Sequence, residues 1–117
     1  MSIKVTVSEL AERVEEYGNA AFVVTSGENG KVKTIHVPVL IQNNLIFCTP
    51  GKGTLANIKE SGPVTLIFPS PVSGGPSMII DGIASISDLK NKTLSIKIDA
   101  GVLHRPSPAA LGENFQC

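Results

Sequence analysis

The chain has 117 residues, enough for one domain with its own hydrophobic core. It carries 10 basic and 10 acidic residues, so no net field attracts nucleic acid or an anionic membrane. Its apolar runs are too short to span a membrane, and residues 1–10 lack the apolar core of a secretion signal. Two cysteines, Cys48 and Cys117, form neither a metal cluster nor a disulfide framework. We therefore expect a cytoplasmic protein with no nucleic-acid and no membrane partner.

The first half of the chain predicts one helix followed by three strands. Thr6 and Glu9 have the spacing of a capping box, which predicts a helix over residues 6–17. Runs rich in β-branched residues follow, separated by Asn-Gly and Asn-Asn turns. Pro38 places the second of these strands at a sheet edge, at a bulge, or with its backbone nitrogen facing away from the ladder. The three predicted strands span residues 20–26, 32–41 and 45–48.

The second half predicts a short helix and three more strands. The helix begins at Thr54 and ends before the Ser61-Gly62-Pro63 stop. The strands span residues 64–68, 78–87 and 93–103. Six strands with short turns and two helices predict an antiparallel barrel filled by Val, Ile and Leu. Such an interior leaves little room, so a sizeable ligand would lie in an outer groove or at a subunit contact, which points to a dimer. We assign residues 1–105 to this domain and 106–117 to a mobile C-terminal tail.

The turn after residues 45–48 has the chemistry that suits a phosphate. It contains Gly51, Lys52 and Gly53, and Thr54 then opens the helix. A helix start has unpaired N–H groups and a positive dipole end, and glycines let a phosphate approach the backbone. Lys52 and the Thr54 hydroxyl would add further donors. The alternative is purely structural, because a glycine turn with a Thr cap is common without any ligand. The segment fails the phosphate-loop pattern of nucleotide hydrolases, which excludes that class.

Four other positions with reactive or charged side chains fit structural roles. Asp81 before Gly82 is typical of a turn or bulge, because no second carboxylate stands at a spacing useful for acid catalysis. Cys48 is expected as a small core residue. Lys31 and Lys33 flank the hairpin turn and are expected on a solvated face.

The order of these segments resembles the flavin-binding split-barrel superfamily, which includes pyridoxamine 5′-phosphate oxidases and small FMN-binding proteins. The resemblance covers most of residues 8–103 and implies a mainly β fold with short helices, a six-stranded antiparallel split β-barrel of the Greek-key type. It also implies a homodimer with FMN at the subunit interface. The segments that carry it are AFVVTS at 21–26, the Asn29-Gly30 turn, TIHVPV at 34–39, LIFCT at 45–49, the turn and helix at 51–57, VTLIF at 64–68 and DGIA at 81–84.

The resemblance also implies which residues hold the cofactor. Strand residues just before the proline line the flavin ring and ribityl chain, and the end of the next strand and the following turn hold the phosphate. In this sequence the first group is Thr34, Ile35, His36 and Val37. The second group is Cys48, Thr49, Lys52, Thr54 and Asn57.

The chain departs from the oxidase pattern in two ways. Oxidase members carry Ser-x-Lys or Ser-Arg-Lys in the turn, whereas here Thr54 stands in the lysine's place and Lys52 lies two residues earlier. They also carry a basic C-terminal extension that grips pyridoxal phosphate, and this chain ends in SPAALGENFQC. We therefore expect a flavoprotein in electron transfer or reduction of an unidentified partner or small molecule, and no true pyridoxamine 5′-phosphate oxidase. Two alternatives stay open: a reductase using deazaflavin F420, and a non-enzymatic dimeric barrel without cofactor.

Overall fold

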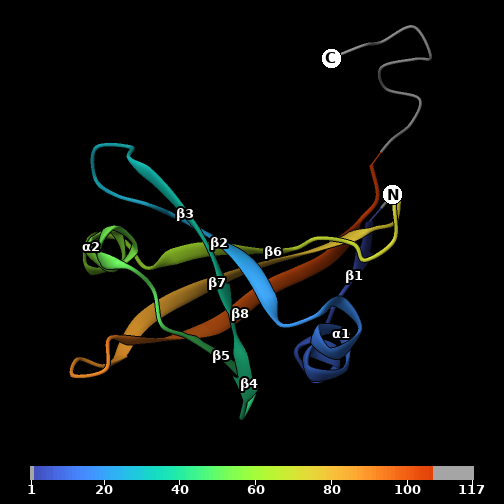
Figure 1. The fold of residues 1–117 in the computed structure, drawn as a ribbon, viewed down its shortest axis with the longest axis horizontal. Helices are drawn as coiled ribbons and strands as arrows, with labels where there is room; N and C mark the ends of the chain where they lie inside the picture. Colours follow the sequence, from blue (N-terminus) through green and yellow to red (C-terminus); the bar gives the residue numbers. More distant parts are fainter. Residues whose placement is uncertain (1, 107–117) are drawn as a thin grey trace, which may run out of the picture.

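The computed structural model of the chain describes residues 2–106 and contains one antiparallel sheet of eight strands with two α-helices (Figure 1). The first part contains β1 (Ser2–Lys4), the 3-10 turn η1 (Val7–Glu9), α1 (Leu10–Tyr17), β2 (Ala20–Ser26), β3 (Val32–Pro38), β4 (Leu40–Gln42) and β5 (Leu45–Cys48). The second part contains α2 (Lys52–Glu60), β6 (Pro63–Phe68), β7 (Ser77–Asp88) and β8 (Thr93–His104). The predicted mainly β class is confirmed, and residues 107–117 of the predicted tail lie outside the described range.

The long hairpin of β7 and β8 forms the spine of the sheet. The strand order is β3-β2-β6-β7-β8-β5-β4, and β1 pairs with β8 beside that path. On β8, β5 takes the first half, with Cys48 opposite Leu94, while β1 takes the last residues, with Lys4 opposite Val102. Strands β3 and β4 lie at the two ends of the strand order but follow each other directly in the chain. The sheet therefore curls strongly, which brings its two ends together (Figure 1). The result is a split half-barrel with α1 and α2 at opposite ends.

Two short strands account for the difference from the six that the sequence predicts. The expected strand over residues 32–41 is divided after Pro38, because the Val39 N–H donates to the Asn19 carbonyl (2.7 Å) instead of joining a ladder. Pro38 ends β3, which is an edge strand, as one of the predicted options requires. The other added strand, β1, has only three residues and pairs solely with β8, so it has no local signal.

The helix ends follow the local signals of the sequence. The Thr6 N–H and hydroxyl both donate to Glu9 Oε1, at 3.2 and 2.8 Å, so this predicted cap is present. Helix α1 ends at Gly18, whose φ of 87° suits glycine. The Tyr17 hydroxyl donates to the Pro76 carbonyl (2.8 Å) and thereby ties α1 to the loop before β7.

Aliphatic side chains fill the inside of the curled sheet, as predicted. Leu66, Phe68, Ile80, Leu94 and Ile96 have no exposed surface, and apolar residues of α1 and α2 close the two ends. The register of β7 and β8 shifts between Asp81 and Gly82, so the predicted bulge is confirmed. A Cβ at Gly82 would lie 2.6 Å from the Lys97 carbonyl oxygen, which explains the glycine at that position.

Candidate functional site

The first turn of α2 is the part of the site that the sequence analysis singled out. The helix begins at Lys52 with Gly51 as its N-cap, so the expectation that Thr54 opens it is wrong. The first intrahelical bond runs from the Leu55 N–H to the Gly51 carbonyl (3.1 Å). The N–H groups of Lys52, Gly53 and Thr54 therefore have no acceptor within the helix and carry its positive dipole end. These free N–H groups lie at residues 52–54, and the expectation that they hold an anion stays a prediction.

Thr54 stands out within this turn because its side chain is buried. Only 1% of Thr54 is exposed, and its hydroxyl oxygen has no hydrogen-bond partner among the described residues. A buried polar group without a partner costs about 1–3 kcal/mol, so native structures seldom retain one without a reason. Lys52, two residues earlier, is exposed. The first turn thus combines free N–H groups, an unsatisfied hydroxyl and an accessible ammonium group.

Lys33 joins this turn from a different element, and the sequence analysis missed it. A methyl group at Gly53 would lie 3.1 Å from Lys33 Cε, so the lysine's alkyl chain lies over the glycine. Lys33 is exposed on β3, as expected of a solvated residue. No sequence pattern connects residues 33 and 53, because only the packing of α2 against β3 brings them together.

Asn57, one turn further along α2, is also buried, but its side chain has hydrogen-bond partners. It is 7% exposed, and its side-chain amide donates to Thr25 Oγ1 (3.2 Å) and to the Lys31 carbonyl (3.3 Å). Near the end of the helix, the Glu60 carboxylate accepts from the Glu28 N–H (2.7 Å). These bonds fasten the helix to the β2–β3 hairpin, so the Asn57 amide group is occupied by the fold.

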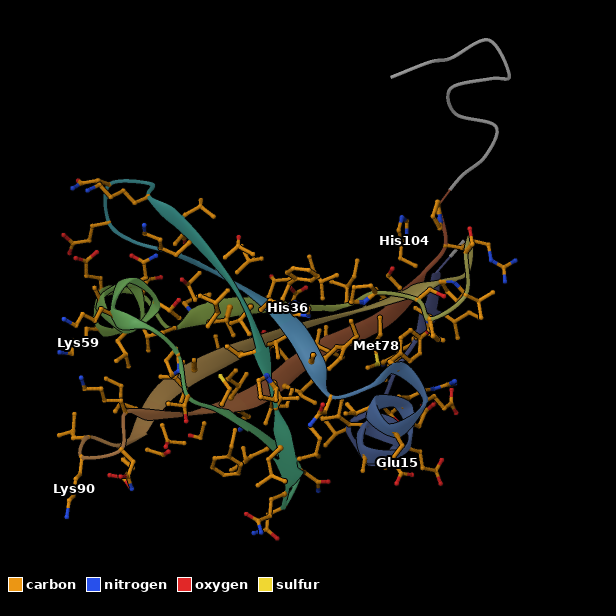
Figure 2. The ribbon with its side chains drawn as sticks, viewed as in Figure 1. Glu15, His36, Lys59, Met78, Lys90 and His104 are labelled. Atoms are coloured by element: carbon orange, nitrogen blue, oxygen red, sulfur yellow. The ribbon has the colours of Figure 1, made fainter. Side chains whose placement is uncertain are left out.

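The four predicted strand residues of β3 divide between its two faces. Ile35 and Val37 are half-buried and pack against the core, whereas Thr34 and His36 are exposed on the outer face. His36 stacks on Phe22, its cross-strand neighbour on β2, with ring centroids 4.1 Å apart and planes 10° from parallel. Figure 2 shows His36 where the ribbons of β2 and β3 cross in this view. Two of the four residues therefore present polar groups outward.

Cys48 ends β5 and Thr49 follows it, and both line a hollow of about 430 Å³ together with Pro38 and Phe47. Cys48 is buried, as a core residue should be, and desolvation raises the pKa of its thiol to about 11. The thiol is therefore protonated near neutral pH and a poor nucleophile. Thr49 is exposed at the same strand end.

The nine predicted cofactor residues thus lie in three places: on both faces of β3, at the end of β5 and in the first turns of α2. Helix α2 packs against β3, and the turn at its start continues directly from the end of β5. The structure brings these elements into one region of the molecule, and the assignment of the nine residues to a cofactor stays a prediction.

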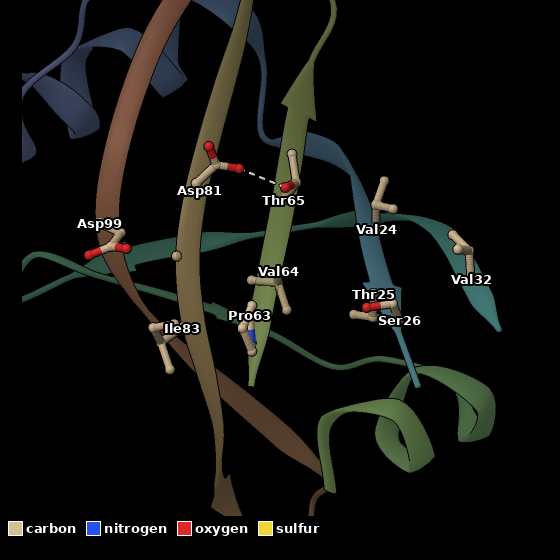
Figure 3. Close-up of a pocket in the computed structure, with 11 residues that line it drawn as sticks. Val24, Thr25, Ser26, Val32, Pro63, Val64, Thr65, Asp81, Ile83 and Asp99 are labelled. Atoms are coloured by element: carbon tan, nitrogen blue, oxygen red, sulfur yellow. Dashed lines mark hydrogen bonds between the residues drawn. The ribbon is translucent and has the colours of Figure 1, made fainter. Parts of the chain in front are cut away.

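A separate hollow of about 380 Å³ lies on the outer face of β2, β6 and β7 (Figure 3). Its walls include Val24, Val32 and Ile83, and Asp81 accepts a hydrogen bond from the Thr65 hydroxyl (2.7 Å). None of the nine predicted residues lines this hollow.

Two classes of feature are absent from the described part of the chain. Residues 2–106 contain no group of three or more His, Cys, Asp or Glu side chains arranged to hold a metal ion. Neither α1 nor α2 has the length and apolar character needed to cross a membrane.

Three solved structures with the same architecture carry different cofactors in their names. No protein-family model and no curated protein matches the chain. An FMN-binding protein from Syntrophomonas wolfei is 13% identical with a TM-score of 0.65, over 81% of this chain and 83% of that one. The FAD-binding protein from Mycobacterium smegmatis is 14% identical with a TM-score of 0.62, over 90% of this chain and 100% of that one. HutZ, the heme storage protein from Vibrio cholerae, is 10% identical with a TM-score of 0.63, over 84% and 93%.

Identities this low establish the fold and leave the ligand to be argued from the chain's own residues. The structural likeness agrees with the resemblance expected from the order of the sequence segments. The chain has the mainly β split-barrel fold found in FMN- and FAD-binding proteins.

Proposed function

We propose that this protein is a homodimeric flavoprotein that binds FMN and takes part in electron transfer or in reduction of a small molecule or protein partner. The observation that carries the proposal is the first turn of α2, which has free N–H groups, the buried and unpartnered Thr54 hydroxyl, and exposed Lys52. The fold shared with FMN- and FAD-binding proteins supports a flavin over other phosphorylated ligands.

The residues of the first turn fit a phosphate dianion. Helix N-terminal N–H groups bind phosphate because their donors and the helix dipole both favour negative charge. A phosphate oxygen would give the Thr54 hydroxyl the acceptor that the described chain lacks, and Lys52 would neutralise charge. Lys33, whose alkyl chain lies over Gly53, would supply a second ammonium group near this turn. This second lysine offsets the departure of the turn from the oxidase pattern.

The ring of the flavin would lie along the outer face of β3 and beyond the end of β5. Thr34 and His36 offer polar groups there, and stacking on Phe22 holds the His36 ring in a fixed orientation. Asn57 acts indirectly in this proposal, because its bonds to Thr25 and to the Lys31 carbonyl hold the helix in place.

A second subunit would complete the site, because aliphatic side chains fill the interior of the described sheet. Outward positions on the sheet alternate with core positions and carry several half-buried apolar side chains. These are Phe22, Val24, Ile67, Ile79 and Val102. Such a face is typical of the core of a subunit contact, and obligate contacts bury about 2,000 Å² or more.

A bound flavin supplies one- and two-electron transfer, and the protein contributes binding, orientation and tuning of the potential. Lys52, Thr54 and the helix N–H groups would anchor the phosphate, so that the ring is held by a fixed point. His36 would lie beside the ring and shape its polar surroundings. In this role a His36→Ala variant changes the flavin spectrum or potential modestly and leaves electron transfer intact.

The test is an absorbance spectrum of the purified protein, followed by titration with FMN, riboflavin, deazaflavin F420 and hemin. Tight FMN binding with weaker riboflavin binding supports the proposal, since only FMN carries the phosphate. Preference for F420 or hemin, or no binding of any of the four, contradicts it. Sedimentation at micromolar concentration is expected to give a dimer, and a monomer would remove the proposed shared site.

A further inference from the structure

A groove between α1 and β4 lies outside the proposed flavin site. It has a volume of about 470 Å³ and is bounded on one side by the helix and on the other by the edge of the sheet. The residues that matter are Ala11, Glu12 and Glu15 of α1, with Val39, Leu40 and Ile41 opposite. Its floor is apolar, and Leu40 is 59% exposed although it is a large aliphatic side chain. The groove therefore has an exposed apolar side chain, Leu40, on one side and the acidic residues Glu12 and Glu15 on the other.

The acidic side of the groove is not neutralised within the described chain. Arg13 pairs with Glu9 (3.4 Å) and Glu16 (3.6 Å) on another face of α1. Glu12 and Glu15 have no ion pair or hydrogen bond among the described residues. Figure 2 shows Glu15 on the side of α1 that faces away from the sheet's spine.

The β4 side of the groove has free backbone groups. Strand β4 is the last strand of the sheet order, and β5 is its one partner among the strands of residues 2–106. Asn43 and Asn44 form the connecting two-residue turn, with φ of 53° and 63°, so Gln42 and Leu45 are its hydrogen-bonded flanking pair. The next pair, Ile41 and Ile46, is then non-hydrogen-bonded, and the Ile41 N–H and C=O point away from β5. An unpaired edge of this kind accepts an added strand.

From this juxtaposition we propose that the groove binds an extended segment of a partner protein with lysine or arginine at alternate positions and an apolar residue between them. The segment exchanges backbone hydrogen bonds with Ile41. Its apolar side chain packs on Leu40, and its basic side chains meet Glu12 and Glu15. A second copy of this chain carries a similar exposed edge at Lys31-Val32-Lys33, and self-association is therefore the alternative occupant that the experiments below distinguish.

The test uses the full chain and a fluorescent probe peptide, acetyl-Lys-Val-Lys-Val-Lys-amide, followed by anisotropy. We expect saturable binding that weakens as salt screens the carboxylates. The double variant Glu12→Gln, Glu15→Gln should bind about five- to tenfold more weakly, as two exposed ion pairs allow. Glu28→Gln is the matched control, because it removes one exposed carboxylate at the β2–β3 hairpin, remote from the groove in sequence and structure.

Changes in the peptide test the backbone contact without altering the fold. N-methylation of the central lysine and its neighbours removes the donors that an added strand needs, and it should abolish binding. A Glu-Val-Glu-Val-Glu peptide should not bind. Equal binding of the N-methylated peptide, of the acidic peptide, or by the Glu12/Glu15 variant would overturn the proposal.

The same variants separate this groove from the flavin site and from self-association. FMN titration of the Glu12/Glu15 variant should match wild type, whether or not FMN binds. Concentration-dependent self-association that the Glu12/Glu15 substitutions abolish would mean that a second copy occupies the groove, and the assignment to a partner segment would be wrong.

Discussion

Two positions one turn apart on α2 show how differently a buried polar side chain can serve a small barrel. Asn57 is 7% exposed and donates to Thr25 Oγ1 and the Lys31 carbonyl. Thr54 is 1% exposed, and its hydroxyl has no partner among the described residues. Both lie on the inner side of the same helix and both were predicted to hold a cofactor. Only one of them is satisfied by the fold itself.

The difference separates stability from ligand binding. The hydrogen bonds of a buried amide offset the free-energy cost of removing it from water, and here they hold the helix on the β2–β3 hairpin. An unsatisfied hydroxyl lowers stability until a ligand or water supplies an acceptor. The middle of α2 is therefore structural, and its first turn is the part left available for a ligand. The predictions below test this division, from the largest expected effect to the smallest.

Asn57→Ala should destabilise the protein by about 2 kcal/mol, because it leaves the buried Thr25 hydroxyl without its donor and removes the contact between α2 and the Lys31 carbonyl, which keeps its bond from the Gly27 N–H. In thermal unfolding the midpoint should fall by roughly 10 °C. Lys59→Gln, an exposed change in the same helix, is the control and should leave the midpoint in place. An unchanged midpoint in Asn57→Ala would show that the hairpin contact is not stabilising.

Thr54→Val should weaken FMN binding without lowering the stability of the ligand-free protein. Valine has nearly the same shape and lacks the unsatisfied hydroxyl, so the ligand-free protein should keep its stability or gain up to about 1 kcal/mol. FMN affinity should fall about tenfold, as the loss of one charge-assisted hydrogen bond implies. Thermal unfolding and an FMN titration measure the two effects. A large loss of stability without ligand would mean that Thr54 is structural like Asn57.

Lys52→Ala should weaken FMN binding by about fivefold and leave unfolding unchanged, because this side chain is exposed and its charge is screened. The effect should shrink at high salt and be absent with riboflavin, which has no phosphate. Lys59→Ala, at the other end of α2, removes the same charge and should not affect affinity. Equal losses in both variants would indicate a general charge effect.

The ionisation of Cys48 should leave the free energy of unfolding almost unchanged at neutral pH and lower it measurably in alkali. Burial raises the pKa of its thiol to about 11 from an ordinary 9.0, so the folded state keeps a proton that the unfolded state releases. This contribution to stability is complete below pH 9 and is lost as the pH rises toward 11. In a Cys117→Ser background, denaturant titrations across this range should show the loss, and a Cys48→Ala variant should not show it.

Local signals predicted most elements of the fold, and tertiary contacts account for the exceptions. Three features could be predicted because each depends on neighbouring residues: the cap at Thr6 and Glu9, the Asn43-Asn44 turn and the Asp81-Gly82 bulge. Strand β1 and the division after Pro38 could not, because β1 is specified by its pairing with β8 and the break by a bond to Asn19. The start of α2 was misplaced because glycine and threonine are about equally good N-caps, so local preference does not choose between Gly51 and Thr54.

The candidate site divides in the same way. The sequence by itself determined a helix N-terminus with glycines and a lysine after a strand, because that arrangement lies within a few consecutive residues. Only the tertiary structure decided that the Asn57 amide is hydrogen-bonded to the β2–β3 hairpin and that the Thr54 hydroxyl has no partner among the described residues. It also decided that Lys33 lies over Gly53. Hydrogen-bond satisfaction depends on which distant groups the packing brings within about 3 Å, and no local pattern encodes those distances.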